Sequence, residues 1–124
     1  MNFTKAEIDF FIKNKEIFKH EWEIGDYVIH IKYGLRLITH TPNKEQLTII
    51  DFETPNDIII DPKDCIWLPT EHDLRVILEE KLGFNNWFDV ECCFMDYCDK
   101  PDNLKETELL TLAEYALKLL KRKQ

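Results

Sequence analysis

Two histidines on neighbouring predicted strands could bind a metal ion. A hairpin centred on Gly34 would place His30 and His40 as diagonal neighbours on one sheet face, about 7 Å apart at Cα. A carboxylate such as Asp51 or Glu53 from the following strand would complete a three-ligand site. The alternative for this face is an exposed sheet surface that holds no metal.

Lys32 and Arg36 lie on the same predicted face. Their positive charges would repel a divalent cation, so they favour the alternative of an exposed sheet surface that holds no metal. They also raise a further possibility, nucleic-acid binding through a local basic patch. The overall charge opposes that, because 16 Lys and Arg stand against 24 Asp and Glu, a net charge of −8. We expect no metal and no cofactor.

The cysteine spacing is not that of a zinc site. Cys92, Cys93 and Cys98 do not form C-x2-C pairs. On a helix the first two side chains point about 100° apart, so they cannot converge on one ion with the third. We expect Cys92 and Cys98 to be small buried apolar groups, with metal binding and a redox role as the alternatives.

Catalytic motifs are also missing from the sequence. The chain contains no serine, which excludes a Ser-His-Asp triad, and its three glycines are far apart, which excludes glycine-rich phosphate loops. Cys65 and His72 are the closest Cys–His pair in sequence, but Asp64 beside the cysteine would raise the thiol pKa. We therefore expect a protein that is not an enzyme.

Net negative charge is concentrated in the predicted helical block of residues 71–108. Residues 71–108 carry 11 acidic and 4 basic side chains, a net charge of −7. Asp89, Glu91, Asp96 and Asp99 would lie on the solvent face of a helix. Such a field speeds encounter with basic surfaces, so we expect a protein partner with a basic face. The alternative is that the charge only maintains solubility.

Several aromatic residues lie near the ends of predicted elements, and some of them could anchor a protein interface while the rest fill the core. This set comprises Trp22, Trp67, Phe84, Trp87 and Phe88.

The elements that position these groups follow from the hydrophobic periodicity. Helices are predicted over residues 4–19, 70–82, 86–98 and 103–122, and five short strands within 22–68. Thr4 and Thr70 are placed as N-caps, Gly83 as a helix stop, and Asn103 as the last N-cap. The third helix would turn Trp87, Val90, Phe94 and Cys98 inward. We expect one α+β domain over residues 1–124.

The last helix carries the clearest apolar stripe. Its inward residues follow i, i+3, i+4 spacing, so we expect the helix to be integral to the fold. These residues are Leu109, Leu112, Ala113, Ala116, Leu117 and Leu120.

Five short strands opened by Gly25-Asp26-Tyr27-Val28 resemble an SH3-like small barrel. That resemblance implies a fold and no particular function. The phrase Ile66-Trp67-Leu68-Pro69 resembles one in small uncharacterised phage and prophage proteins, where it closes a sheet and leads into a helix. It implies an accessory protein that acts on a protein partner.

The cellular location is predicted from the absence of export signals. The first residues show no basic and apolar leader pattern, and no apolar stretch approaches about 18 residues. We expect a cytoplasmic protein without a membrane span, whose cysteines are reduced.

Overall fold

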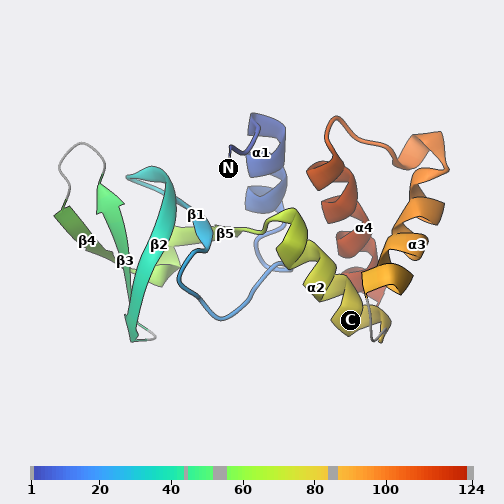
Figure 1. Ribbon diagram of the computed structural model, residues 1–124. Helices are drawn as coiled ribbons and strands as arrows, with labels where there is room; N and C mark the ends of the chain where they lie inside the picture. Colours follow the sequence, from blue (N-terminus) through green and yellow to red (C-terminus); the bar gives the residue numbers. More distant parts are fainter. Residues whose placement is uncertain (1, 44, 52–55, 84–86, 123–124) are drawn as a thin grey trace. The chain divides into compact units, whose positions relative to one another are not determined.

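The computed structural model describes residues 2–43, 45–51, 56–83 and 87–122 (Figure 1). It is an α+β protein, with four α-helices and one five-stranded antiparallel sheet in the described ranges. The chain divides into two compact units, Met1–Leu68 and Pro69–Gln124. The first holds the N-terminal helix and the sheet, and the second holds three helices. The expectation of a single domain stays a prediction.

Helix α1, Lys5–Lys13, begins with the predicted capping box. The Thr4 hydroxyl accepts from the Glu7 backbone N–H at 3.2 Å, and the Glu7 carboxylate accepts from the Thr4 N–H at 2.8 Å. The helix ends six residues before the predicted end at residue 19. The Asn14 side chain donates to the Phe10 carbonyl at 2.8 Å, and this local bond competes with continuation of the helix.

The five strands form the sheet order β4-β3-β2-β1-β5. β1 pairs with both β2 and β5, and β2, β3 and β4 follow one another as a meander. A short 3-10 helix, η1, Pro62–Asp64, precedes the last strand. The strands are β1 Tyr27–His30, β2 Gly34–Asn43, β3 Gln46–Asp51, β4 Asn56–Ile60 and β5 Cys65–Leu68.

Alternation along the strands sends one side of the sheet into an apolar core, in which Trp22, Tyr33, Ile58 and Cys65 pack against fully buried residues. α1 contacts β5, and Phe11 of the helix is 1% exposed. The fully buried set is Val28, Ile38, Leu47, Ile49 and Ile60.

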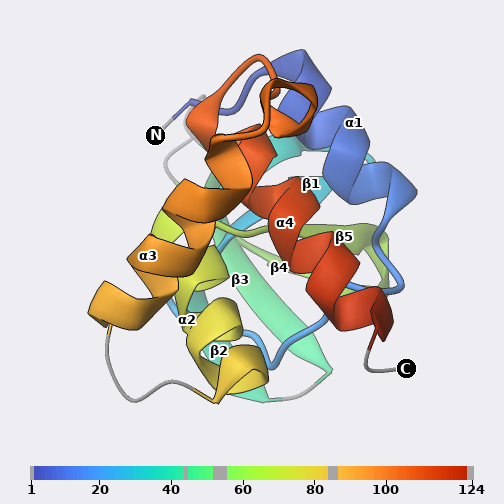
Figure 2. The same ribbon diagram turned by 90° about the vertical axis from the view of Figure 1, so that its right-hand side faces the viewer.

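Helix α2, Glu71–Leu82, has the predicted ends. The Thr70 hydroxyl accepts from the Asp73 N–H at 3.2 Å, and Gly83 closes the helix with a left-handed φ of 72°. Leu74 and Leu78 are fully buried. Figure 2 shows α2 with the other two helices of this unit, and α2 contacts both.

Helices α3, Trp87–Cys98, and α4, Glu108–Arg122, complete the second unit. The predicted start of the third helix at Asn86 lies outside the described residues. The apolar stripe of α4 is confirmed as core: five of its six residues are buried, and Leu120 is half-buried. No helix among the described residues is long and apolar enough to cross a membrane.

The last helix starts later than the predicted residue 103. Pro101–Asn103 form a 3-10 turn, η2, and the Asn103 side chain donates to the Tyr97 carbonyl instead of capping a helix. Thr107 takes the capping position, because its hydroxyl accepts from the Leu110 N–H at 3.1 Å. Residues 104–107 therefore form a loop along α3.

Candidate protein-binding surface

One side of α3 is packed and the other is exposed and apolar. Val90 and Phe94 are buried, whereas Phe88 and Met95 are 61% and 65% exposed. Cys92 is exposed as well. Phe88, Cys92 and Met95 are spaced i, i+4 and i+7, which places them along one line of the helix surface. We call these three residues the α3 stripe.

Trp87 extends the exposed apolar surface at the start of α3. Its ring contacts Phe88 with centroids 6.2 Å apart, and the side chain is 66% exposed. The prediction that Trp87 faces inward is wrong. Its helical angle matches that of Phe94, but Trp87 is the first residue of the helix and lies beyond its packed middle.

The other predicted aromatic anchors lie elsewhere. Trp67 is buried in the first unit and Trp22 is half-buried there. Phe84 lies outside the described residues. Exposed aromatic surface in the second unit is therefore provided by Trp87 and Phe88 among the described residues.

Three of the four predicted carboxylates border the α3 stripe. Asp89 and Asp96 are seven residues apart, so they lie along one flank of it. Asp99 lies eleven residues after Phe88 and continues the line of the stripe. Asp96 and Asp99 are exposed, and Asp89 is half-buried. A ligand on the stripe would meet these carboxylates along one flank and at the end.

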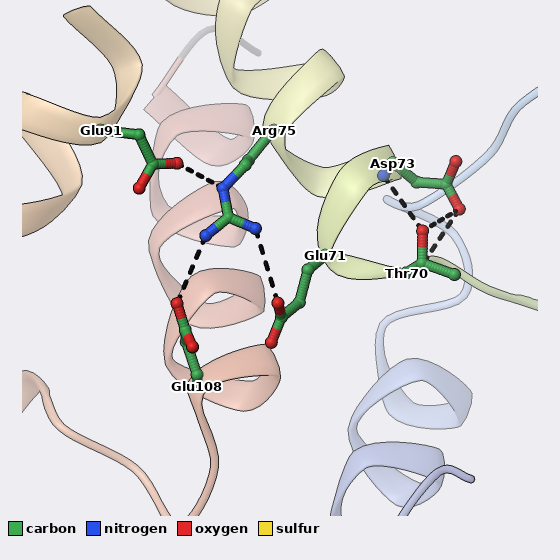
Figure 3. Close-up of polar contacts among 6 residues, drawn as sticks. All are labelled: Thr70, Glu71, Asp73, Arg75, Glu91 and Glu108. Carbon is green, nitrogen blue, oxygen red and sulfur yellow. Dashed lines mark hydrogen bonds and ion pairs between the residues drawn. The ribbon is translucent and has the colours of Figure 1, made fainter. Parts of the chain in front are cut away.

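Glu91, the fourth predicted carboxylate, forms an ion pair within the unit. The Arg75 Nε donates to it, while the guanidinium nitrogens lie 3.3 Å from Glu108 and 3.6 Å from Glu71 (Figure 3). Burial opposes the charge on Arg75, but the Glu91 hydrogen bond and the three carboxylates together raise its pKa. Glu91 is therefore a structural residue that joins α3 to α2 and α4.

A cavity of about 500 Å³ adjoins the α3 stripe. Met95 belongs to both, and Phe94, Leu104 and Thr111 supply further apolar wall. Leu104 is 54% exposed although it is apolar. The stripe therefore leads into a hollow that could hold an apolar side chain. The acidic residues around the hollow are Glu91, Asp99, Glu106 and Glu108, beside Lys105.

The sequence analysis did not find this cavity, because residues 103–107 were predicted to be helical. The signal that could have found it is Thr107, a good N-cap residue four positions after Asn103. A helix that starts there leaves Leu104 and Lys105 in a loop, where they can line a hollow.

All four cysteines are free thiols. Burial, with Asp64 and Asp61 nearby, raises the pKa of Cys65 to about 12, in the predicted direction. Burial, followed by nearby acidic groups, also raises the pKa of Cys93 and Cys98. The prediction that Cys92 is a buried group is wrong, because it lies on the exposed stripe. Cys98, also predicted to be buried, is only half-buried.

The predicted pairing of His30 with His40 is wrong. His30 is opposite Gly34, whereas His40, six positions further along β2, is opposite Thr48. The turn occupies residues 31–33 instead of being centred on Gly34, because the His30 Nδ1 accepts from the backbone N–H groups of residues 32 and 33 at 3.0 and 3.2 Å.

The two histidine candidates for a metal site lie in different surroundings. His30 is 7% exposed and stabilises this turn. His40 is exposed on β2, six positions beyond Gly34. Glu53 lies outside the described residues. Within the described ranges, no group of three or more His, Cys, Asp or Glu residues could hold a metal ion.

Lys32 and Arg36, the predicted basic pair, do not both lie on strands. Lys32 lies in the turn after β1, with its ammonium 5.2 Å from the centre of the Tyr33 ring. Arg36 lies on β2 opposite Val28, is half-buried, and donates to the Leu35 carbonyl at 2.8 Å. Each cation is thus engaged by the residue next to it.

Comparison of this chain with protein-family models, curated proteins and solved structures finds no match. The function must therefore be argued from the residues described above.

Proposed function

We propose that this protein is a non-enzymatic binding module that takes a protein partner with a basic face through α3. The observation that carries the proposal is the exposed α3 stripe, bordered by carboxylates and continuing into a cavity. The partner supplies apolar side chains to the stripe and Lys or Arg to Asp89, Asp96 and Asp99.

The chemistry of the stripe favours a protein over other ligands. Exposed aromatic and methionine side chains in one line are typical of protein interfaces, since they offer large apolar area and adaptable shape. Scattered single apolar residues would need no such explanation. Here Trp87, Phe88, Met95 and Leu104 are all more than half exposed within one three-helix unit.

The charge of the surface favours a basic partner. Residues 71–108 carry a net charge of −7, and Arg75 is already surrounded by three carboxylates. Nucleic acid would be repelled by such a surface, because its affinity for proteins comes mainly from phosphate contacts with Lys and Arg. Basic protein segments would be attracted and oriented.

The first unit supports a proposal about fold. The strand order β4-β3-β2-β1-β5, with η1 immediately before β5, supports the interpretation of the sheet as an SH3-like barrel. We further propose a phage-related accessory role in the cytoplasm. The phage-related role is supported by the segment in which Trp67 and Leu68 of β5 lead through Pro69 into α2. The cytoplasmic location is supported by the four free thiols.

Capture of partners by matched variants tests the proposal. Immobilised wild-type protein is compared with Phe88→Ser/Met95→Ser and with Asp89→Lys/Asp96→Lys/Asp99→Lys, and captured proteins are identified by mass spectrometry at 50 and 500 mM salt. A supporting partner has a basic surface and is lost with both variants. Its capture also weakens at high salt, where the Debye length falls to a few ångströms.

Two control variants in α2 separate the stripe from the unit as a whole. Val76→Ser removes an exposed apolar side chain, and Glu80→Lys reverses an exposed charge. Both should retain the partner. Two results would contradict the proposal. One is a partner that the stripe variants bind as well as the wild type does. The other is capture of a nucleic acid in place of a protein.

A further inference from the structure

A second cavity lies within the first unit, far along the chain from the α3 stripe. Its volume is about 510 Å³. The segment after α1 forms one side of it, and η1 together with the first residues of β5 forms another. Its lining includes Lys15, Lys19, His20, Trp22, Lys63 and Trp67.

Flat aromatic groups form part of the lining. The His20 ring stacks on Trp67 with centroids 3.6 Å apart and planes 14° apart, and it meets Trp22 edge-on at 5.9 Å. The His20 Nε2 lies 2.8 Å from an oxygen of Asp26, which is 7% exposed and also accepts from the Glu23 N–H at 2.8 Å. The His20–Asp26 contact is not a hydrogen bond by its geometry, so the orientation of the imidazole comes from its stacking on the Trp67 indole.

Trp67 also carries an unsatisfied donor. Its side chain is 5% exposed, and its Nε1 is buried without a hydrogen-bond partner among the described residues. An indole N–H can only donate, and leaving it without an acceptor costs about 1–3 kcal/mol. Because this nitrogen is closed to solvent, it is not a contact for a ligand in the cavity, and its N–H serves instead as a reporter on the cavity wall that Trp67 helps to form.

The charge around this cavity differs from that of the rest of the protein. Lys15, Lys19 and Lys63 are exposed at its edge, against Glu16 and Asp64. Lys19 pairs with Glu16 at 2.9 Å. The Asp61 carboxylate accepts from the Lys63 backbone N–H at 2.9 Å and so holds η1, which carries this lysine. The cavity therefore has a net cationic edge in a chain of net charge −8.

We propose that this cavity binds a small planar anion, an aromatic ring that carries a carboxylate or a phosphate group. The ring stacks against the aromatic lining, and the anionic group meets Lys15 and Lys63. Neither a neutral ring nor a bare inorganic anion satisfies both features.

Titration of the full-length protein followed by the indole N–H signals in ¹H–¹⁵N NMR spectra tests the proposal. Benzoate and phenyl phosphate are the probes, with benzyl alcohol as the neutral ring and inorganic phosphate as the bare anion. The Trp67 signal should move saturably with at least one aryl anion, while the Trp87 signal stays in place. The stronger of the two aryl anions identifies the anionic group.

Variants assign the contacts. Lys15→Gln/Lys63→Gln removes both charge-assisted contacts and should weaken binding by at least about tenfold. Lys13→Gln, an exposed position on α1 that does not line the cavity, is the matched control and should leave binding unchanged.

Three results would overturn the proposal. One is the absence of a saturable Trp67 shift with both aryl anions at 20 mM. Another is equal binding of benzyl alcohol or of inorganic phosphate. The third is undiminished binding by the double lysine variant. None of these results bears on the α3 stripe, which lies in the other unit.

Discussion

Cys65 shows how one residue's environment decides its chemistry. Its thiol donates to the Asp61 carbonyl at 3.7 Å, and the side chain packs against the core of the sheet. Burial of the thiol, with the carboxylates of Asp64 and Asp61 nearby, raises its pKa from 9.0 to about 12. At neutral pH this cysteine is a packing residue, and Cys92, exposed on the α3 stripe, is the accessible thiol.

The raised pKa of Cys65 predicts a loss of stability at alkaline pH. Above pH 9 the unfolded chain releases the thiol proton while the folded chain retains it up to about pH 12. The free energy of unfolding therefore falls as pH rises through this window. Urea unfolding at pH 7.5, 9 and 10.5 should show this fall.

The matched variants isolate the contribution of this thiol. Cys65→Ala should unfold with a shallower dependence on pH than the wild type, although Cys93, Cys98 and Tyr115 act in the same direction. Cys92→Ala, at an exposed position, should keep the wild-type dependence. Identical pH profiles for wild type and Cys65→Ala would contradict the assignment.

At the scale of elements, Arg75 fastens three helices together. It extends from α2 to Glu91 of α3 and Glu108 of α4, with Glu71 one turn before it on its own helix (Figure 3). The geometry needs the planar guanidinium, since an ammonium cannot serve carboxylates in three directions equally well. Without this cation, three carboxylates would face one another.

Removal of the Arg75 guanidinium should destabilise the second unit. Arg75→Met keeps much of the aliphatic length and should lower the free energy of unfolding by about 1–3 kcal/mol, because the carboxylates lose their counter-charge. Arg75→Lys should recover only part of the free energy of unfolding that Arg75→Met loses. Urea unfolding followed by circular dichroism at 222 nm measures both.

A double-mutant cycle with Glu91→Gln identifies the contact responsible. If Arg75 acts through Glu91, the loss from Arg75→Met should be smaller in the Glu91→Gln background. Full additivity of the two losses would mean that the pair is not coupled.

The apolar stripe of α4 predicts a second, larger effect on stability. Leu117 is 7% exposed, so Leu117→Asp would bury a charge without a partner and should cost about 3–5 kcal/mol. Thermal unfolding measures this loss. Lys121→Asp, an exposed position on the same helix, should change the midpoint little. If Leu117→Asp melts like the wild type, the stripe is not core.

Much of the element order followed from local signals. Thr4 with Glu7, Thr70 with Asp73, and Gly83 mark helix ends through bonds within four residues, so the sequence predicts them well. The predicted end of the first helix and start of the last helix are wrong. Asn14 closes α1 through its bond to the Phe10 carbonyl, and Thr107 caps α4 in place of Asn103, which has a similar propensity for that position.

The candidate site was less predictable than the fold. The carboxylates near the α3 stripe were found from charge alone, but the exposure of Trp87 and Cys92 depends on where other helices cover α3. The prediction that His30 and His40 are neighbours is wrong because the turn between β1 and β2 has three residues, and this shifts every later residue of β2 relative to β1. Such register is set by long-range pairing that a single sequence does not display.

At the scale of the whole molecule, charge and apolar surface occur together. The two units carry equal net charges of −4, but in the second unit residues 71–108 concentrate a net charge of −7 beside large exposed apolar side chains. The first unit carries the cationic cavity beside the sheet. We interpret the two units as bearing separate binding functions, a protein surface on α3 and a small-anion site beside β5.

Cys92 lies on the α3 stripe, so its accessibility reports directly on whether this stripe is the docking surface. Wild-type protein, alone and in the complex isolated by capture, is alkylated briefly with N-ethylmaleimide at pH 7.5, and each cysteine is quantified by peptide mass spectrometry. The account predicts rapid modification of Cys92 in the free protein, at least about tenfold slower modification in the complex, and slow modification of Cys65 in both. Equal rates at Cys92 in the free and bound protein would contradict it.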